Sequence, residues 1–69
     1  MTVASVTEIS AASPEGFEAA TREGIERANK TLRNVQSAWV KDINVLMEDG
    51  QIRAYKVNLL VTFVLDDGA

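Results

Sequence analysis

Tryptophan, lysine and carboxylate side chains are the groups in this sequence that could do chemistry. Trp39 is the only tryptophan, and it lies in the stretch NVQSAWVKDINV, residues 34–45. An aromatic of this size can fill a core, join subunits or stack on a flat ligand. Catalysis lacks its usual residues, because the chain contains neither histidine nor cysteine, and nothing in the order of residues suggests a Ser, Thr or Lys that a carboxylate or a buried amine would activate. We therefore predict that the protein is not an enzyme.

Lys56 and several acidic residues are the remaining candidates for binding. Lys56 can hold a phosphate of a nucleotide-like ligand as a point charge, or it can pair with a carboxylate across a sheet. Calcium takes several oxygen ligands, and a symmetric assembly can gather carboxylates from several chains. The acids that could contribute are Asp42, Glu48, Asp49, Asp66 and Asp67. Turn chemistry and an acidic chain end are the simpler explanations for the last four, so the metal site stays unknown.

Length and charge limit the class of protein. A chain of 69 residues is one domain, residues 1–69, and a domain of this size needs disulfides, a metal or self-association to be stable. Without cysteine or histidine, self-association remains. A formal charge of −3 argues against binding nucleic acid, no apolar run is long enough to span a membrane, and the N-terminus does not resemble a signal peptide. We predict a cytoplasmic protein with no nucleic-acid or membrane partner.

The elements that position these residues follow from local patterns. We predict a first strand over 2–10, a helix over 14–33, and two further strands over 35–48 and 51–65. Ser13 followed by Pro14 is typical of a helix N-cap with proline at the first helical position. Asp49 and Gly50 between the last two strands predict a tight hairpin turn.

Two sets of apolar residues predict how the helix and the sheet pack. Along the helix, small and apolar residues recur with a period of about 3.6, at Phe17, Ala20, Gly24, Ile25, Ala28 and Leu32. The apolar residues of the last strand share odd numbers and therefore one face, namely Tyr55, Val57, Leu59, Val61, Phe63 and Leu65. We predict that this face lies beneath the helix.

The resulting architecture is an α+β fold, β-α-β-β, with a three-stranded antiparallel sheet and one helix packed on one face. The sequence offers no second helix for the other face, where Leu60 and Val64 would meet water. A half-apolar sheet face with free edges is a surface for self-association. We therefore predict an oligomer in which the sheets pack face to face or surround an interior.

The sequence also resembles the dodecin family over about residues 3–67. The resemblance rests on SPEGFEAATREGIERANKTLRNV, then a long strand, the DG turn, and the last strand YKVNLLVTFVLDD. It implies a hollow homododecamer with helices outside and sheets lining the interior. It also implies a storage or buffering protein, since the best-known members bind riboflavin or FMN and some bind coenzyme A or calcium.

When the flavin site of the family is compared residue by residue, this chain has different residues at both flavin-contacting positions. Flavin-binding members stack a strand-two Trp on the flavin in patterns such as W-A-E-V, and the resemblance puts this Trp position at Ser37 and the pattern's Glu at Trp39. A Gln of the last strand, in patterns such as Y-Q-V, falls on Lys56. Ser37 and Trp39 differ by two positions, so they should face the same side of the strand, roughly 6–7 Å apart.

Two functions therefore stay open. The first is a flavin-binding, non-enzymatic storage protein with Ser37, Trp39 and Lys56 at its ligand site. The second is a divergent dodecin that ignores flavin, and instead binds a cation such as calcium or a phosphate-bearing ligand, or serves only as a shell. Aromatic residues at subunit junctions more often pack than hold cofactors, so the sequence favours subunit packing for Trp39 over ligand stacking.

Overall fold

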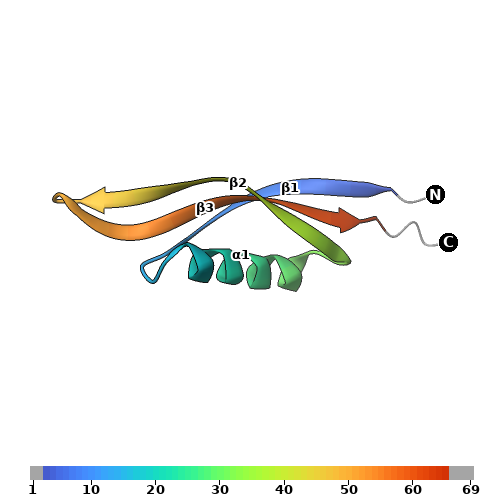
Figure 1. Ribbon diagram of the computed structural model, residues 1–69. Helices are drawn as coiled ribbons and strands as arrows, with labels where there is room; N and C mark the ends of the chain where they lie inside the picture. Colours follow the sequence, from blue (N-terminus) through green and yellow to red (C-terminus); the bar gives the residue numbers. More distant parts are fainter. Residues whose placement is uncertain (1–2, 66–69) are drawn as a thin grey trace.

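The computed structural model describes residues 3–65, which form one helix and three strands (Figure 1). In chain order these are β1 (Ala4–Ser13), α1 (Phe17–Thr31), β2 (Val35–Glu48) and β3 (Gln51–Val64). The order in the sheet is β1-β3-β2, and both outer strands run antiparallel to β3. The predicted β-α-β-β fold is confirmed. Asp66 and Asp67 lie outside the described residues, as does the first residue of the predicted strand 2–10.

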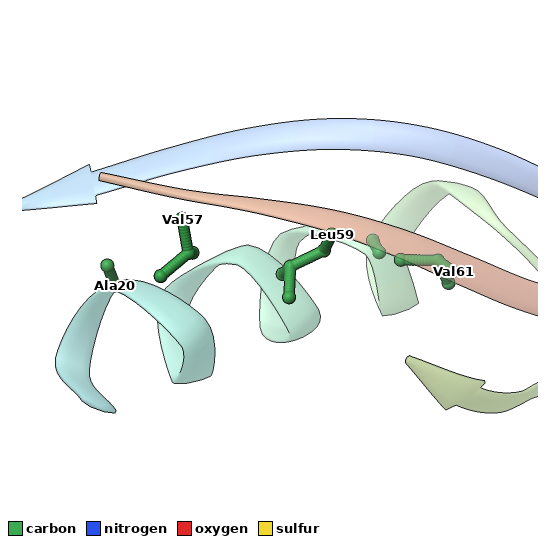
Figure 2. Packing of buried hydrophobic residues seen from close by; sticks show 5 residues of the cluster. Ala20, Val57, Leu59 and Val61 are labelled. Carbon is green, nitrogen blue, oxygen red and sulfur yellow. The ribbon is translucent and has the colours of Figure 1, made fainter. Parts of the chain in front are cut away.

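The core lies between α1 and one face of the sheet. Val57, Leu59 and Val61 of β3 are at most 1% exposed, and they face Ala20 and Ala28 of the helix (Figure 2). The predicted packing of the odd-numbered β3 residues beneath the helix is thus confirmed for the centre of the strand. The apolar stripe of α1 packs against the sheet. Within residues 3–65 no helix is long and apolar enough to cross a bilayer.

Gly24 allows the helix to approach the sheet closely. A Cβ atom at this position would lie 3.0 Å from the Ala11 Cβ and 3.1 Å from the Leu59 Cδ1. Both distances are shorter than comfortable packing between carbon atoms. The absence of a side chain at Gly24 therefore sets the separation of α1 from β1 and β3.

The predicted start of the helix is wrong. Ser13 is not an N-cap: it is the last residue of β1, pairs with Tyr55 and is 2% exposed. Its Oγ accepts a hydrogen bond from the Glu15 backbone N–H at 3.1 Å. The strand pairing holds Ser13 extended, so a turn over 14–16 follows and the helix begins at Phe17. Gly16, with φ 145°, is the N-cap and makes no side-chain capping bond, a conformation that glycine adopts without strain.

The other predicted ends are also shifted. β1 continues three residues past the predicted strand 2–10, because its ladder with β3 persists as far as Ser13. The helix ends at Thr31 rather than at residue 33, since Leu32 is already extended with φ −108° and ψ 140°. The backbone N–H of Leu32 still donates to the Ala28 carbonyl. These ends could not be predicted from the sequence pattern, because they depend on contacts with residues that are distant along the chain.

The hairpin of β2 and β3 projects past the rest of the chain (Figure 1). Asp49 and Gly50 form its turn with φ 52° and 75°, which confirms the predicted tight turn, since two positive φ angles are typical of the hairpin type I′. β1 pairs with β3 only from Tyr55 onward, so the end of the hairpin is a two-stranded ribbon. Met47 and Ile52 of this ribbon are exposed.

Candidate functional site

Ser37, Trp39 and Lys56 lie on the sheet face that α1 does not cover, here called the open face. Residues paired across neighbouring strands share a face. Trp39 pairs with Leu60 and Ser37 pairs with Thr62, and the even-numbered residues of β3, including Lys56, point away from the buried odd-numbered ones. The prediction that Ser37 and Trp39 face the same side is confirmed.

Trp39 does not belong to the core of the chain. Its side chain is 74% exposed, beside the half-buried Leu60. This excludes the first of the three roles considered for the tryptophan, the filling of the core. Subunit packing and ligand stacking remain, and both need something outside this chain to cover the ring.

Two irregularities in β2 change which residues reach the open face. The pairing of β2 with β3 shifts between Val35 and Ser37, and again between Val40 and Asp42. Each shift is a β-bulge, which adds one residue to a strand and re-aims the side chains that follow. After the second bulge Asp42 pairs with Asn58, so its carboxylate lies on the open face. Strict alternation from Trp39 would have placed it on the helix side.

A row of hydrogen-bonded polar side chains crosses all three strands on the open face. Ser10 of β1 donates its hydroxyl hydrogen to the Asn58 Oδ1, and the Asn58 Nδ2 donates to the Asp42 Oδ1. A carboxylate can only accept, so Asp42 fixes which way the amide of Asn58 points. The amide oxygen then fixes the direction of the Ser10 hydroxyl. We call Ser10, Asn58 and Asp42 the polar row.

The charged side chains near Trp39 are paired with each other. The Lys41 Nζ lies 3.4 Å from both carboxylate oxygens of Glu8, and since β1 and β2 flank β3, this pair crosses the central strand. Within residues 3–65, Lys56 makes no ion pair. The cross-sheet partner expected as its simpler role is therefore not found there. Lys56 is therefore a cation on the open face without an acidic partner in the part of the chain that the structure describes.

The remaining predicted acids do not gather. Glu48 ends β2 and Asp49 is a turn residue, so both lie at the tip of the hairpin. Within residues 3–65 no three acidic side chains come close enough to hold a metal ion. A calcium site built from the described acids would need carboxylates from several copies of the chain.

A groove of about 460 Å³ opens on the other side of the sheet, between α1 and β1. Its lining includes apolar side chains from both elements, such as Ile9, Ala11 and Leu32, with Glu23 and Arg27 also contributing. None of the three predicted ligand residues reaches it. The ligand residues predicted from the sequence therefore lie on the open face, and the groove lies on the helix side of the sheet.

The chain is thus a small β-α-β-β protein in which a helix closes one face of the sheet and the other face carries an exposed aromatic and a polar row. The sequence model of the dodecin family matches residues 3–66. The chain belongs to the dodecin family.

Relatives of known sequence and of solved structure match nearly the whole chain. A dodecin from Thermus thermophilus is 37% identical over 60 residues, 87% of each chain. The solved dodecin from Streptomyces davaonensis has 39% identity and a TM-score of 0.90, covering 96% of this chain and 97% of its own. The solved dodecin from Streptomyces coelicolor has 33% identity and a TM-score of 0.91, covering 96% and 94%.

Proposed function

We propose that this protein is a non-enzymatic binding and storage protein. It assembles into a hollow homododecamer with its open faces inward, and it holds a flat ligand of the flavin class, riboflavin or FMN, on that face. The observation that carries this proposal is the 74% exposed Trp39 beside the polar row on an otherwise uncovered sheet face. Membership of the dodecin family supports the same function.

Exposed apolar residues support assembly. Val6 lies on the open face, 56% exposed, while Val40 and Ile43 lie on the helix side of β2, 44% and 52% exposed. Helix α1 lies mainly against β1 and β3, so neither set is covered within one chain. Apolar surface of this extent favours association. Native mass spectrometry should give a particle of about twelve chains, and a stable folded monomer would contradict the proposal.

The purified protein tests the ligand directly. A yellow preparation with quenched flavin fluorescence, or tight binding of added riboflavin or FMN, is expected. Fluorescence titration measures capacity even where purification has removed the ligand. An assembled protein that stays colourless and binds neither flavin would contradict flavin binding and leave the assembly standing.

Lys56 supports a second candidate function. At the position where flavin-binding relatives of the resembled pattern have Gln, this chain has a cation without an ion pair in the described residues. A phosphate-bearing ligand other than a flavin would suit it. If flavin fails to bind, the alternative is a divergent dodecin that binds such a phosphate-bearing ligand. Calcium binding at a symmetry axis and a purely structural shell are the other forms of this alternative.

A further inference from the structure

Three kinds of chemistry follow one another along the open face. Trp39 and Leu60 form an apolar row on β2 and β3, with Glu8 beside Leu60 on β1; Asn58 is the centre of the polar row, and Lys56 follows. Positions 60, 58 and 56 are two residues apart on β3, so neighbouring rows are separated by roughly 6–7 Å and the ring of Trp39 lies roughly 13 Å from Lys56 along the strand. A single ligand of ordinary size can contact all three.

The polar row has more free acceptors than donors. Asp42 uses one carboxylate oxygen for Asn58, and Ser10 uses its hydroxyl hydrogen for the same amide. The second oxygen of Asp42 and the lone pairs of Ser10 therefore remain, against one amide hydrogen of Asn58. A surface of this kind suits groups that donate hydrogen bonds, above all hydroxyls.

The charges decide where an anionic group can lie. The carboxylate of Asp42 repels an anion from the polar row, and Lys41 near the apolar row is already neutralised by Glu8. At the far side of the polar row, Lys56 is a cation with no acidic partner among residues 3–65. A ligand is therefore matched on the open face when its flat ring lies at Trp39, its hydroxyl groups lie at the polar row, and its anionic group lies at Lys56.

We propose that the polar row recognises the hydroxylated chain of a ligand whose flat ring lies against Trp39 and Leu60 and whose anionic end meets Lys56. Asn58, held by Ser10 and Asp42, is the specificity-determining residue. This inference rests on the proposed function and adds that the protein distinguishes flavins by their hydroxylated chain. Stacking holds the ring, and the hydroxylated chain adds affinity and selects between ligands that share the ring.

Two flavins that share a ring test this proposal. Riboflavin carries a hydroxylated chain, whereas lumiflavin carries a methyl group in its place. Fluorescence titration of the assembled protein should show tighter binding of riboflavin. In Asn58→Val the riboflavin affinity should fall about 3- to 10-fold, as for the loss of one or two hydrogen bonds, while lumiflavin affinity stays constant. Thr62→Val, on the same strand and face but beyond the apolar row, is the matched control and should change neither.

Two further variants keep the test decisive if Asn58→Val does not assemble. Lys56→Gln should weaken FMN binding and leave riboflavin unaffected, and Asp42→Asn should raise the affinity for FMN relative to riboflavin by removing the repelling charge. Equal losses for riboflavin and lumiflavin, or unchanged affinities in every variant, would overturn the role of the polar row while flavin binding itself stands. Wild-type protein that binds none of the three flavins overturns the proposed function and this inference together.

Discussion

Replacing Trp39 with alanine separates ligand stacking from subunit packing. Truncating a fully buried Trp costs about 3–5 kcal/mol, but Trp39 is 74% exposed, so its own chain covers about a quarter of the side chain. The contribution to the stability of the chain is then about 1 kcal/mol, which corresponds to a fall in Tm of about 4–8 °C for a domain of this size. A larger effect must come from a partner surface.

For a stacking role, Trp39→Ala should leave the assembly intact. Stacking of a flat ring on an aromatic side chain contributes about 1–3 kcal/mol, so the riboflavin affinity should fall about 5- to 150-fold. Native mass spectrometry measures the assembly, thermal melting measures stability, and fluorescence titration measures affinity. Ile43→Ala is the matched control, because Ile43 lies on the same strand but faces the helix side. It should weaken assembly without a direct effect on flavin.

The opposite pattern would refute the stacking role. If Trp39→Ala dissociates the particle, and the stability falls by the full 3–5 kcal/mol expected for a buried Trp with or without flavin, then the ring is covered by a second subunit. Trp39 would then have the subunit-packing role that its position in the sequence favours.

Further predictions concern packing, ligand choice and metal. Gly24→Ala should destabilise the fold, because overpacking costs about 1–3 kcal/mol and outweighs about 1 kcal/mol of helix propensity; adding Ala11→Gly should relieve part of the loss, and a melting point at or above wild type would contradict the close contact. Ser37→Trp, Trp39→Glu and Lys56→Gln together move the aromatic ring by two positions and remove the cation, so flavin binding should weaken in titrations; an intact triple variant that binds flavin more tightly than wild type would show that the flavin ring lies at position 37 and not at Trp39. If carboxylates of several copies meet at a symmetry axis, calcium should raise the Tm and a chelator lower it, because a ligand bound only by the native state stabilises that state; no shift would leave these acids as ordinary surface.

The fold could be predicted from the sequence because its signals are local. The helical stripe, the odd-numbered apolar residues of β3 and the turn at Asp49 and Gly50 each depend on neighbours along the chain. The start of the helix could not, since the extended conformation of Ser13 is imposed by its partner Tyr55 in a distant strand.

The candidate site was predictable only in part. The shared face of Ser37 and Trp39 follows from strand alternation, and Lys56 follows from the resemblance to dodecins. The polar row was missed because a bulge brings Asp42 to the open face, and period-two alternation cannot place a bulge. Asn58 likewise could not be recognised as a site residue before its hydrogen-bond partners Ser10 on β1 and Asp42 on β2 were known.

In the proposed assembly, the projecting ribbon of β2 and β3 would couple folding to association. The chain measures 54 × 19 × 14 Å, and the ribbon beyond Tyr55 is supported by neither α1 nor β1. Two strands alone are at best marginally stable in water, so in a dissociated chain the ladder opens from the turn toward Tyr55. In the proposed assembly, contact with another copy would close it, so the ordering of the ribbon should depend on protein concentration while the core at Leu59 should not.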